Sequence, residues 1–377
     1  MVQAEAVIDL DAIRDNTAVL AGQTSAAVMA VVKADGYGHG MVPAARAALA
    51  GGATYLGACT VSEALALRAA GIDAPMLAWL FSPSVDLAPA VLAKIDLSAA
   101  SVDDLRRIEA AVDATGVTAR VHLKVDTGLG RNGSPAQLWP ELLQLAAKAQ
   151  ASNAIEIVGV WSHFACADEP GHPSIVAQLD AFEDALNLAA QLGVRPLLRH
   201  LANSAATLTV PRSHFDMVRP GIALYGLSPM HGRESEFGLR GAMTLRAEVA
   251  LTKRVGAGHG VSYGLTYTTD RETTLALIPL GYGDGIPRAL SSKAPIFVNG
   301  AWHTIAGRVC MDQVVIDVGD EKVLPGDVAI LFGPGDAGEP HVNDWAEAMD
   351  TINYEIVTRI SARVPRRYVG GAAQPVI

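Results

Sequence analysis

Cysteine is scarce in this sequence, with three residues among 377, at Cys59, Cys166 and Cys310. Their number is odd and no two of them form a Cys-x-x-Cys pair, which argues against a disulfide framework and a structural zinc site. A His-Glu-x-x-His motif is also missing, so we expect no catalytic metal. Such cysteine usage is typical of a reducing compartment, and we expect a cytoplasmic location.

Positive charge is also in short supply. The chain has 29 Lys and Arg residues against 39 Asp and Glu residues, a formal net charge of -10. No run of basic residues is longer than a pair such as Arg366-Arg367. A nucleic-acid-binding protein would show a basic patch, so the sequence favours a small-molecule partner.

Long apolar runs are absent as well. No window holds the roughly 20 uncharged apolar residues that cross a bilayer, so we expect no membrane span. Residues Met1 to Leu10 include Glu5 and Asp9, where a signal peptide would need a basic start and an unbroken apolar stretch. The chain is 50% hydrophobic and 18% charged, which is ample material for a globular core.

Short β-branched runs alternate with longer alanine-rich amphipathic stretches from Ala26 to about Gly226. This alternation is the pattern of parallel strands joined by crossover helices. Because about eight such runs can be counted, the sequence predicts an α/β fold, a (β/α)8 barrel of the TIM type. The predicted strands are Ala27 to Val32, Tyr55 to Cys59, Met76 to Leu80, Ile95 to Ala99, Val121 to Val125, Ile157 to Trp161, Leu197 to Leu201 and Phe215 to Val218.

Helix signals support this pattern. Thr60, Ser101 and Ser134 stand where N-terminal caps are expected, the last of them followed by Pro135. Glycines, as at Gly71 and Gly193, stand where such helices would end.

After Gly241 the pattern changes to strands separated by glycine turns, which predicts a smaller, mostly-β domain. The boundary is expected between Pro229 and Gly241, which gives a barrel domain over residues 1–235 and a β domain over residues 236–377. Its predicted strands are Thr244 to Val255, Leu275 to Leu280, Pro295 to Trp302, Val314 to Val318 and Val328 to Phe332.

Basic and hydroxyl side chains follow several of the predicted barrel strands. Active sites of such barrels lie at the carboxyl ends of the strands, and these groups suit a phosphorylated or carboxylated ligand. Gly221 would let backbone N–H groups approach a phosphate; the alternative is that Ser204 only caps a helix and Gly221 only permits a turn. The candidates are Lys33, Lys124, Arg131, His163, Asn203, Ser204 and Arg219.

Lys33 ends the first predicted strand and precedes a loop with glycines at Gly36, Gly38 and Gly40. A lysine at such a position is either a surface charge or, in a desolvated and cation-rich site, a nucleophile. The glycine clusters of the chain lack the Gly-x-Gly-x-x-Gly spacing of a dinucleotide site.

Several segments along the chain form a set of motifs in a fixed order: Ala30 to Gly40, Trp161 to Ala165, His200 to Ser204, Arg219 to Gly226, Val261 to Gly264 and Gly307 to Gln313. These motifs resemble those of the alanine racemases, enzymes of fold type III that depend on pyridoxal 5'-phosphate. The resemblance runs nearly end to end, with one departure, Ala34-Asp35-Gly36 where Ala-Asn-Ala is the commonest form. This departure leaves the lysine, tyrosine and histidine of the motif in place.

The resemblance implies a two-base racemisation of alanine that supplies D-alanine for peptidoglycan. Lys33 would carry the cofactor and serve the D face of the substrate, and Tyr263 would serve the L face. In this family the tyrosine comes from the other subunit, so the resemblance implies a homodimer with shared sites. Without the family, Tyr263 would pass for an ordinary strand tyrosine.

Further roles are carried over from the family. Arg219 would face the pyridine nitrogen, with His163 as its hydrogen-bond partner; a core histidine is the alternative for His163. The expected phosphate contacts are Tyr37, Ser204, Gly221, Ile222 and Tyr354. Arg131 and Met311 would bind the substrate carboxylate, supported by Lys124, which is often carbamylated in the family, and by Asp312. Tyr282, Asp168, Arg288, Arg308 and Ile352 resemble residues of a narrow entry corridor; plain surface charge is the alternative for the two arginines.

Other activities remain open at this point. A pyridoxal-phosphate racemase of another small amino acid such as serine, a decarboxylase of the same barrel class and a non-catalytic cofactor carrier are the alternatives. Tyr263 and Met311-Asp312 argue against the decarboxylase, and the long β domain after Gly241 argues against the carrier.

Overall fold

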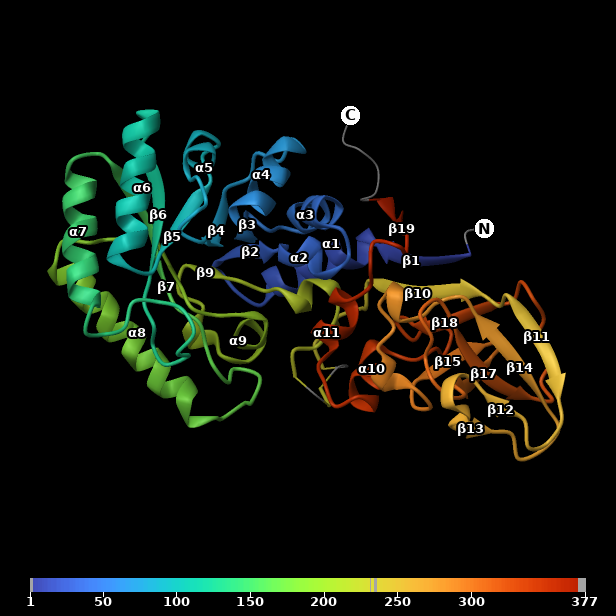
Figure 1. Ribbon diagram of the computed structural model, residues 1–377. Helices are drawn as coiled ribbons and strands as arrows, with labels where there is room; N and C mark the ends of the chain where they lie inside the picture. The colour runs from blue at the N-terminus through green and yellow to red at the C-terminus, as the bar shows by residue number, and fades with distance from the viewer. Residues whose placement is uncertain (1–2, 231, 234–235, 372–377) are drawn as a thin grey trace.

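The computed structural model describes residues 3–230, 232–233 and 236–371, which form an α/β barrel next to a mostly-β unit (Figure 1). The domain boundary predicted after residue 235 falls at residues outside this description and stays a prediction. Within the described ranges, no helix has the length and apolar character needed to cross a membrane.

All eight predicted barrel strands are present, and they form one parallel sheet in the order β8-β7-β6-β5-β4-β3-β2-β9. The α/β barrel prediction is therefore confirmed. The strands are β2 (Ala27–Val31), β3 (Tyr55–Thr60), β4 (Met76–Leu80), β5 (Asp96–Ala99), β6 (Ala119–Lys124), β7 (Ile155–Trp161), β8 (Leu198–His200) and β9 (Met217–Val218).

The barrel is nearly closed where its two shortest strands, β8 and β9, meet. No ladder joins these strands, but two backbone hydrogen bonds tie their ends together. The Asp216 N–H donates to the Arg199 carbonyl at 3.0 Å, and the Arg219 N–H donates to the Ala202 carbonyl at 2.9 Å. As a result, the carboxyl ends of all eight strands surround one opening.

The connecting helices lie outside the strands (Figure 1). Thr60 and Ser101 are N-caps as predicted, because their hydroxyls accept the N–H groups of Glu63 and Asp104. The start predicted at Ser134 is wrong: the backbone of Ser134 is bonded to the end of β6, and the helix begins at Trp139. The helices are α1 (Leu10–Gly22), α2 (Lys33–Tyr37), α3 (Met41–Ala50), α4 (Val61–Ala69), α5 (Ala88–Leu92), α6 (Val102–Thr115), α7 (Trp139–Ala151), α8 (Pro173–Gln191) and α9 (Ser204–Thr209).

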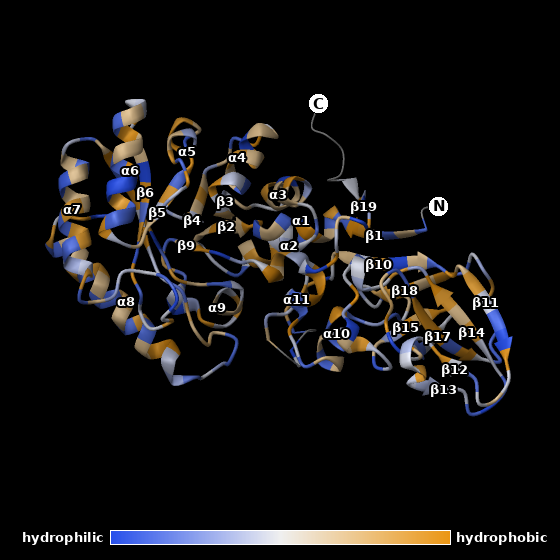
Figure 2. Cartoon of the chain, in the orientation of Figure 1, coloured by the Kyte–Doolittle hydropathy of each residue, from blue (hydrophilic) through white to orange (hydrophobic). Residues whose placement is uncertain are grey.

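The second unit is built on a six-stranded sheet of order β16-β15-β18-β10-β1-β19, with β11-β14-β17 as a smaller sheet. Figure 2 shows β14 and β17 as mostly apolar, whereas α6 on the barrel surface carries many hydrophilic residues. The strands are β10 (Met243–Glu248), β11 (Leu251–Val255), β12 (Gly260–Val261), β13 (Tyr267–Thr268), β14 (Thr273–Ile278), β15 (Pro295–Val298), β16 (Ala301–Thr304), β17 (Val314–Gly319), β18 (Val328–Phe332) and β19 (Arg366–Val369), and the helices are α10 (Val342–Ala348) and α11 (Asn353–Thr358).

Sequence reasoning missed the first strand, β1 (Ala4–Asp9), which lies in the sheet of the second unit between β10 and β19 (Figure 1). The start of the chain is thereby tied to its end. Glu5 on β1 is buried and bonds to Arg246 of β10 at 2.6 Å and to Arg367 of β19 at 3.0 Å. Burial alone would raise the pKa of the Glu5 carboxyl, but the two arginines outweigh it and lower that pKa.

We predict that Glu5→Gln lowers the free energy of unfolding by about 1–3 kcal/mol at pH 7, because two arginines lose a charged partner. The stabilisation from Glu5 is present above the unfolded pKa, near 4.5, and is lost as pH falls through the lower folded pKa. Urea denaturation followed by circular dichroism should therefore show a deficit that shrinks in acid. Glu272→Gln is the control, since Glu272 is 68% exposed beside Arg254; a deficit of equal size in both variants would contradict the account.

Candidate active site

A cavity of about 390 Å³ opens at the carboxyl ends of the barrel strands. Active sites of this fold lie at that end. Most of its wall comes from the barrel, and α11 of the second unit adds the rest. The lining residues are Val31, Lys33, Ala34, Tyr37, Trp79, Lys124, Arg131, Trp161, His163, Asn203, Ser204, Arg219, Gly221, Ile222, Tyr354 and Thr358.

Lys33 lies two residues after the end of β2 and begins a turn of unusual backbone conformation. Ala34, Asp35 and Tyr37 have φ angles of 52°, 52° and 53°, the left-handed region that side chains other than glycine rarely adopt. The turn is held in part by the Glu63 carboxylate, which accepts the Ala34 N–H at 2.7 Å. Backbone strain of this kind concentrates at ligand sites.

The Lys33 amine lies between two aromatic rings inside the cavity wall. Its Nζ is 6.0 Å from the centre of the Tyr37 ring and 5.8 Å from that of Trp79. Burial lowers the pKa of the Lys33 ammonium, and the charge of Arg131 lowers it further. The site thus favours the neutral, nucleophilic amine.

One end of the cavity is built from Ser204, Gly221 and Tyr37. Asn203, not Ser204, caps α9, so the Ser204 hydroxyl is available to accept the Gly221 N–H at 2.8 Å. A Cβ on Gly221 would come within 2.3 Å of the Tyr37 hydroxyl, so the glycine is required for this close approach. Hydroxyls and backbone N–H groups of this kind suit a phosphate.

Arg219 is buried and has four hydrogen-bond acceptors. Its Nη2 donates to the Ser162 carbonyl at 2.7 Å, to His163 Nδ1 at 3.1 Å and to the Leu201 carbonyl at 3.1 Å, and its Nη1 donates to His200 Nδ1 at 3.2 Å. Burial lowers the pKa of this guanidinium to about 9, so it remains a cation at neutral pH.

Lys124 and Arg131 complete a group of four cations with Lys33 and Arg219. The Lys124 Nζ lies 4.1 Å from the centre of the Trp161 ring. Burial, with the charges of Arg219 and Arg131, lowers the pKa of the Lys124 ammonium to about 7. A cavity that collects so much positive charge is suited to an anionic ligand.

Eleven of the predicted site residues meet at this cavity, and four of the predicted catalytic, substrate-binding and supporting residues do not. Tyr263, Tyr282, Met311 and Asp312 lie on the second unit, and the first three are 71%, 45% and 54% exposed. Tyr263 begins the 3-10 turn η3 (Tyr263–Leu265) rather than lying in a strand. The Tyr282 N–H donates to the Cys310 carbonyl, next to Met311, which keeps these residues together on one surface.

The expected corridor residues are also divided between the barrel and the second unit. Asp168 lies close enough to Tyr354 that its charge, after burial of the ring, raises the pKa of that phenol. Ile352 is 60% exposed at the start of α11, and Arg288 is exposed in the turn η5 (Arg288–Leu290).

The sequence matches two family models in succession. The alanine racemase N-terminal domain matches residues 8–229, and the alanine racemase C-terminal domain matches residues 242–368. The chain belongs to the alanine racemase family. It is therefore an amino-acid racemase, an enzyme of the isomerase class.

Relatives in the family match over almost the whole chain. An alanine racemase of Salinispora arenicola is 60% identical over 371 residues, which cover 98% of this chain and 99% of the relative. The crystal structure of an alanine racemase from Streptomyces lavendulae has a TM-score of 0.97 at 53% identity and covers 98% of both chains. An alanine racemase from Bacillus anthracis with bound L-Ala-P has a TM-score of 0.91 at 36% identity, over 99% of this chain and 96% of that one.

Two residues that line the cavity belong neither to the predicted candidates nor to the matching motif segments. Trp79 lies inside the apolar strand β4, and Thr358 is the last residue of α11. Trp79 carries a weak signal, because its polar N–H stands near the carboxyl end of a barrel strand. Thr358 has none, since it reaches the cavity only through the packing of the second unit on the barrel.

We predict that Gly221→Ala weakens the binding of a phosphorylated ligand, with pyridoxal phosphate as the probe, about 10- to 100-fold, the equivalent of a modest overpacking. The added methyl group would displace the Tyr37 hydroxyl from the end of the cavity that it forms with Ser204 and Gly221. Titration of the probe into ligand-free protein measures the affinity. Gly22→Ala is the control, since a Cβ there meets nothing within 4 Å; equal affinity in all three proteins would show that this approach is unimportant.

Proposed function

We propose that this chain interconverts L-alanine and D-alanine with pyridoxal phosphate as its cofactor, in a cytoplasmic homodimer that supplies D-alanine for peptidoglycan. The observation that carries the proposal is the convergence of Lys33, Lys124, Arg131 and Arg219 on one cavity whose other end is lined by hydroxyls and backbone N–H groups. Family membership supports the reaction, and the charge of the cavity supports the cofactor.

The residues present fit this cofactor. Tyr37, Ser204, Tyr354 and the backbone of Gly221 and Ile222 would hold the phosphate, and the close approach of Tyr37 to Gly221 leaves a cradle that a Cβ would fill. Lys33 would bind the aldehyde carbon, and Arg219 would face the ring nitrogen. When bound, pyridoxal phosphate withdraws electrons from the α-carbon and so makes its proton acidic.

Arg219 can only donate a hydrogen bond, so it would leave the ring nitrogen without a proton. That weakens the electron withdrawal and suppresses side reactions such as transamination. Arg131 would orient the substrate by binding its carboxylate, with the backbone of Met311 from the partner surface completing the contact.

Racemisation requires one group to remove a proton from one face of the α-carbon and another to deliver one to the opposite face. Lys33 has a lowered pKa and a place in the cavity, which suit the first role on the D face. Tyr263 is 71% exposed and is not part of its own cavity wall, so it would serve the L face of a second copy of the chain.

The exposed surface around Tyr263 supports the homodimer. Tyr263, Leu265 and Met311 are large apolar side chains of the second unit that are 71%, 64% and 54% exposed. Exposed apolar groups of this size commonly mark a protein interface. The modest cavity volume favours alanine, and serine is the neighbouring substrate to test.

The reaction is tested by incubating the purified protein and pyridoxal phosphate with L-alanine and, separately, L-serine, then measuring the D-enantiomer with a D-amino-acid oxidase. We expect D-alanine to form faster than D-serine. Absence of both products from a protein that retains the cofactor would favour a non-catalytic carrier instead.

Lys33 is tested by borohydride reduction of the protein with its cofactor, followed by peptide mass spectrometry. Reduction should fix the cofactor covalently on the peptide that contains Lys33, because the Lys33 amine loses its proton more readily than the amine of a surface lysine. Lys148, an exposed helical lysine of α7, is the internal reference for nonspecific labelling. A label fixed mainly on Lys124 would exclude the assignment.

A further inference from the structure

Three polar residues face one another inside the barrel, below the cavity. Asp96 lies on β5, His122 on β6 and His200 on β8, and each is at most 1% exposed. His122 Nε2 is 3.1 Å from Asp96 Oδ2, and His122 Nδ1 is 2.8 Å from His200 Nε2. His200 Nδ1 is in turn 3.2 Å from Arg219 Nη1. An unbroken chain of hydrogen bonds thus joins Asp96 to the cavity arginine.

The direction of these hydrogen bonds is fixed by the two residues at the ends of the series, Arg219 and Asp96. Arg219 can only donate, so His200 Nδ1 must be an unprotonated acceptor. The His200 proton is then on Nε2 and is donated to His122 Nδ1. That leaves the His122 proton on Nε2, where it is donated to the Asp96 carboxylate. The opposite direction would place two donors face to face between His200 and Arg219.

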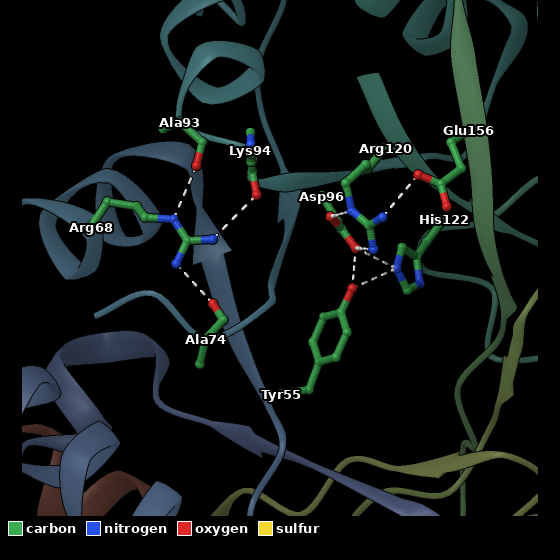
Figure 3. A network of polar contacts seen from close by, with 9 residues as sticks. All are labelled: Tyr55, Arg68, Ala74, Ala93, Lys94, Asp96, Arg120, His122 and Glu156. Carbon is green, nitrogen blue, oxygen red and sulfur yellow. Dashed lines mark hydrogen bonds and ion pairs between the residues drawn. The ribbon is translucent and has the colours of Figure 1, made fainter. Parts of the chain in front are cut away.

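The charges around Asp96 suit a hydrogen bond that His122 donates to its carboxylate. Figure 3 shows Asp96 between His122, Tyr55 and Arg120. Arg120 Nε lies 2.7 Å from Asp96 Oδ1, and the Tyr55 hydroxyl donates to Asp96 Oδ2. Burial alone would raise the pKa of Asp96, but the hydrogen bonds from His122, Arg120 and Tyr55 lower it, so the carboxylate is charged.

The surrounding barrel is shaped to hold the imidazoles. A Cβ on Gly159 of β7 would come within 2.3 Å of His122 Nδ1, so the glycine makes room for this ring. The Trp161 ring stacks on His200 with centroids 5.6 Å apart and an angle of 10°, and its Nε1 donates to Ser98 at 3.0 Å. Neither histidine can turn without breaking these contacts.

We propose that Asp96, His122 and His200 are positioning residues that hold Arg219 in a single orientation toward the cofactor ring through a one-way chain of hydrogen bonds. Buried polar groups are costly unless they are fully paired, and an apolar barrel interior would be simpler to build. The hydrogen-bond chain links Arg219 to a carboxylate that lies outside the cavity. A carboxylate inside the cavity would compete with an anionic ligand for the lysines and arginines there. The role toward the cofactor rests on the proposed function.

The hydrogen-bond direction is tested by nitrogen NMR of the cofactor-bound protein labelled with ¹⁵N-histidine, with signals assigned through His122→Gln and His200→Gln. We expect both imidazoles to carry their proton on Nε2. A proton on Nδ1 of either ring in the unsubstituted protein would overturn the proposal. This measurement requires no activity, and the same spectrum of cofactor-free protein checks it independently of the proposed function.

The decisive variant is Asp96→Asn, with Glu156→Gln as its matched control. The introduced amide would present its N–H₂ group to His122, because Arg120 occupies the other oxygen; both histidines should then move their protons to Nδ1 and oppose Arg219. We expect this variant to lower kcat about 10- to 100-fold while retaining the cofactor. Glu156 lies 2.9 Å from the far side of Arg120 and is 45% exposed, so its variant should change kcat by less than about twofold.

The outcomes separate the possible failures. Asp96→Asn with unchanged histidine protons and unchanged kcat contradicts the proposal and assigns Asp96 to stability alone. Loss of activity with unchanged histidine protons contradicts it as well. If the unsubstituted protein forms no D-alanine but shows both Nε2 protons, the hydrogen-bond chain stands and the proposed function fails.

Discussion

The structure depends on gathering positive charge in one partly buried cavity. Lys33, Lys124, Arg131 and Arg219 face one cavity, and none of them forms an ion pair with a carboxylate within the described ranges of the chain. Burial of Lys124, followed by the charges of Arg219 and Arg131, lowers its pKa to about 7. An anionic ligand relieves the repulsion among these cations, and that relief contributes to its binding.

Both structural units are needed to maintain this arrangement. The barrel supplies the cations at the ends of its strands, and α11 supplies Tyr354, whose ring lies 6.1 Å from that of Tyr37. The strand β1 joins the sheet of the second unit before the barrel begins, so the chain fastens the two units at both ends. The second unit can therefore place exposed residues such as Tyr263 at a fixed position relative to the barrel.

Much of this could be predicted from the sequence, for identifiable reasons. The barrel strands are short apolar runs with clear boundaries, and residues such as Lys33 and Arg219 follow them directly. β1 was missed because Glu5, a charged residue, is buried there and interrupts the apolar pattern. Ser134 looked like a helix cap, but its backbone pairs with β6 instead. The partners of Asp96 and His122 depend on which strands lie side by side, which no local pattern specifies. The role proposed for Tyr263 came only through the family resemblance.

The most direct test of shared sites mixes two variants that the proposed mechanism expects to be inactive, Lys33→Ala and Tyr263→Phe, under conditions in which subunits exchange. A mixed dimer would hold one site with both bases intact and one with neither. Random mixing should therefore restore about a quarter of the activity of the unsubstituted protein. Activity that stays at the level of the separate variants, although exchange is verified by mass, would contradict a site built from two copies of the chain.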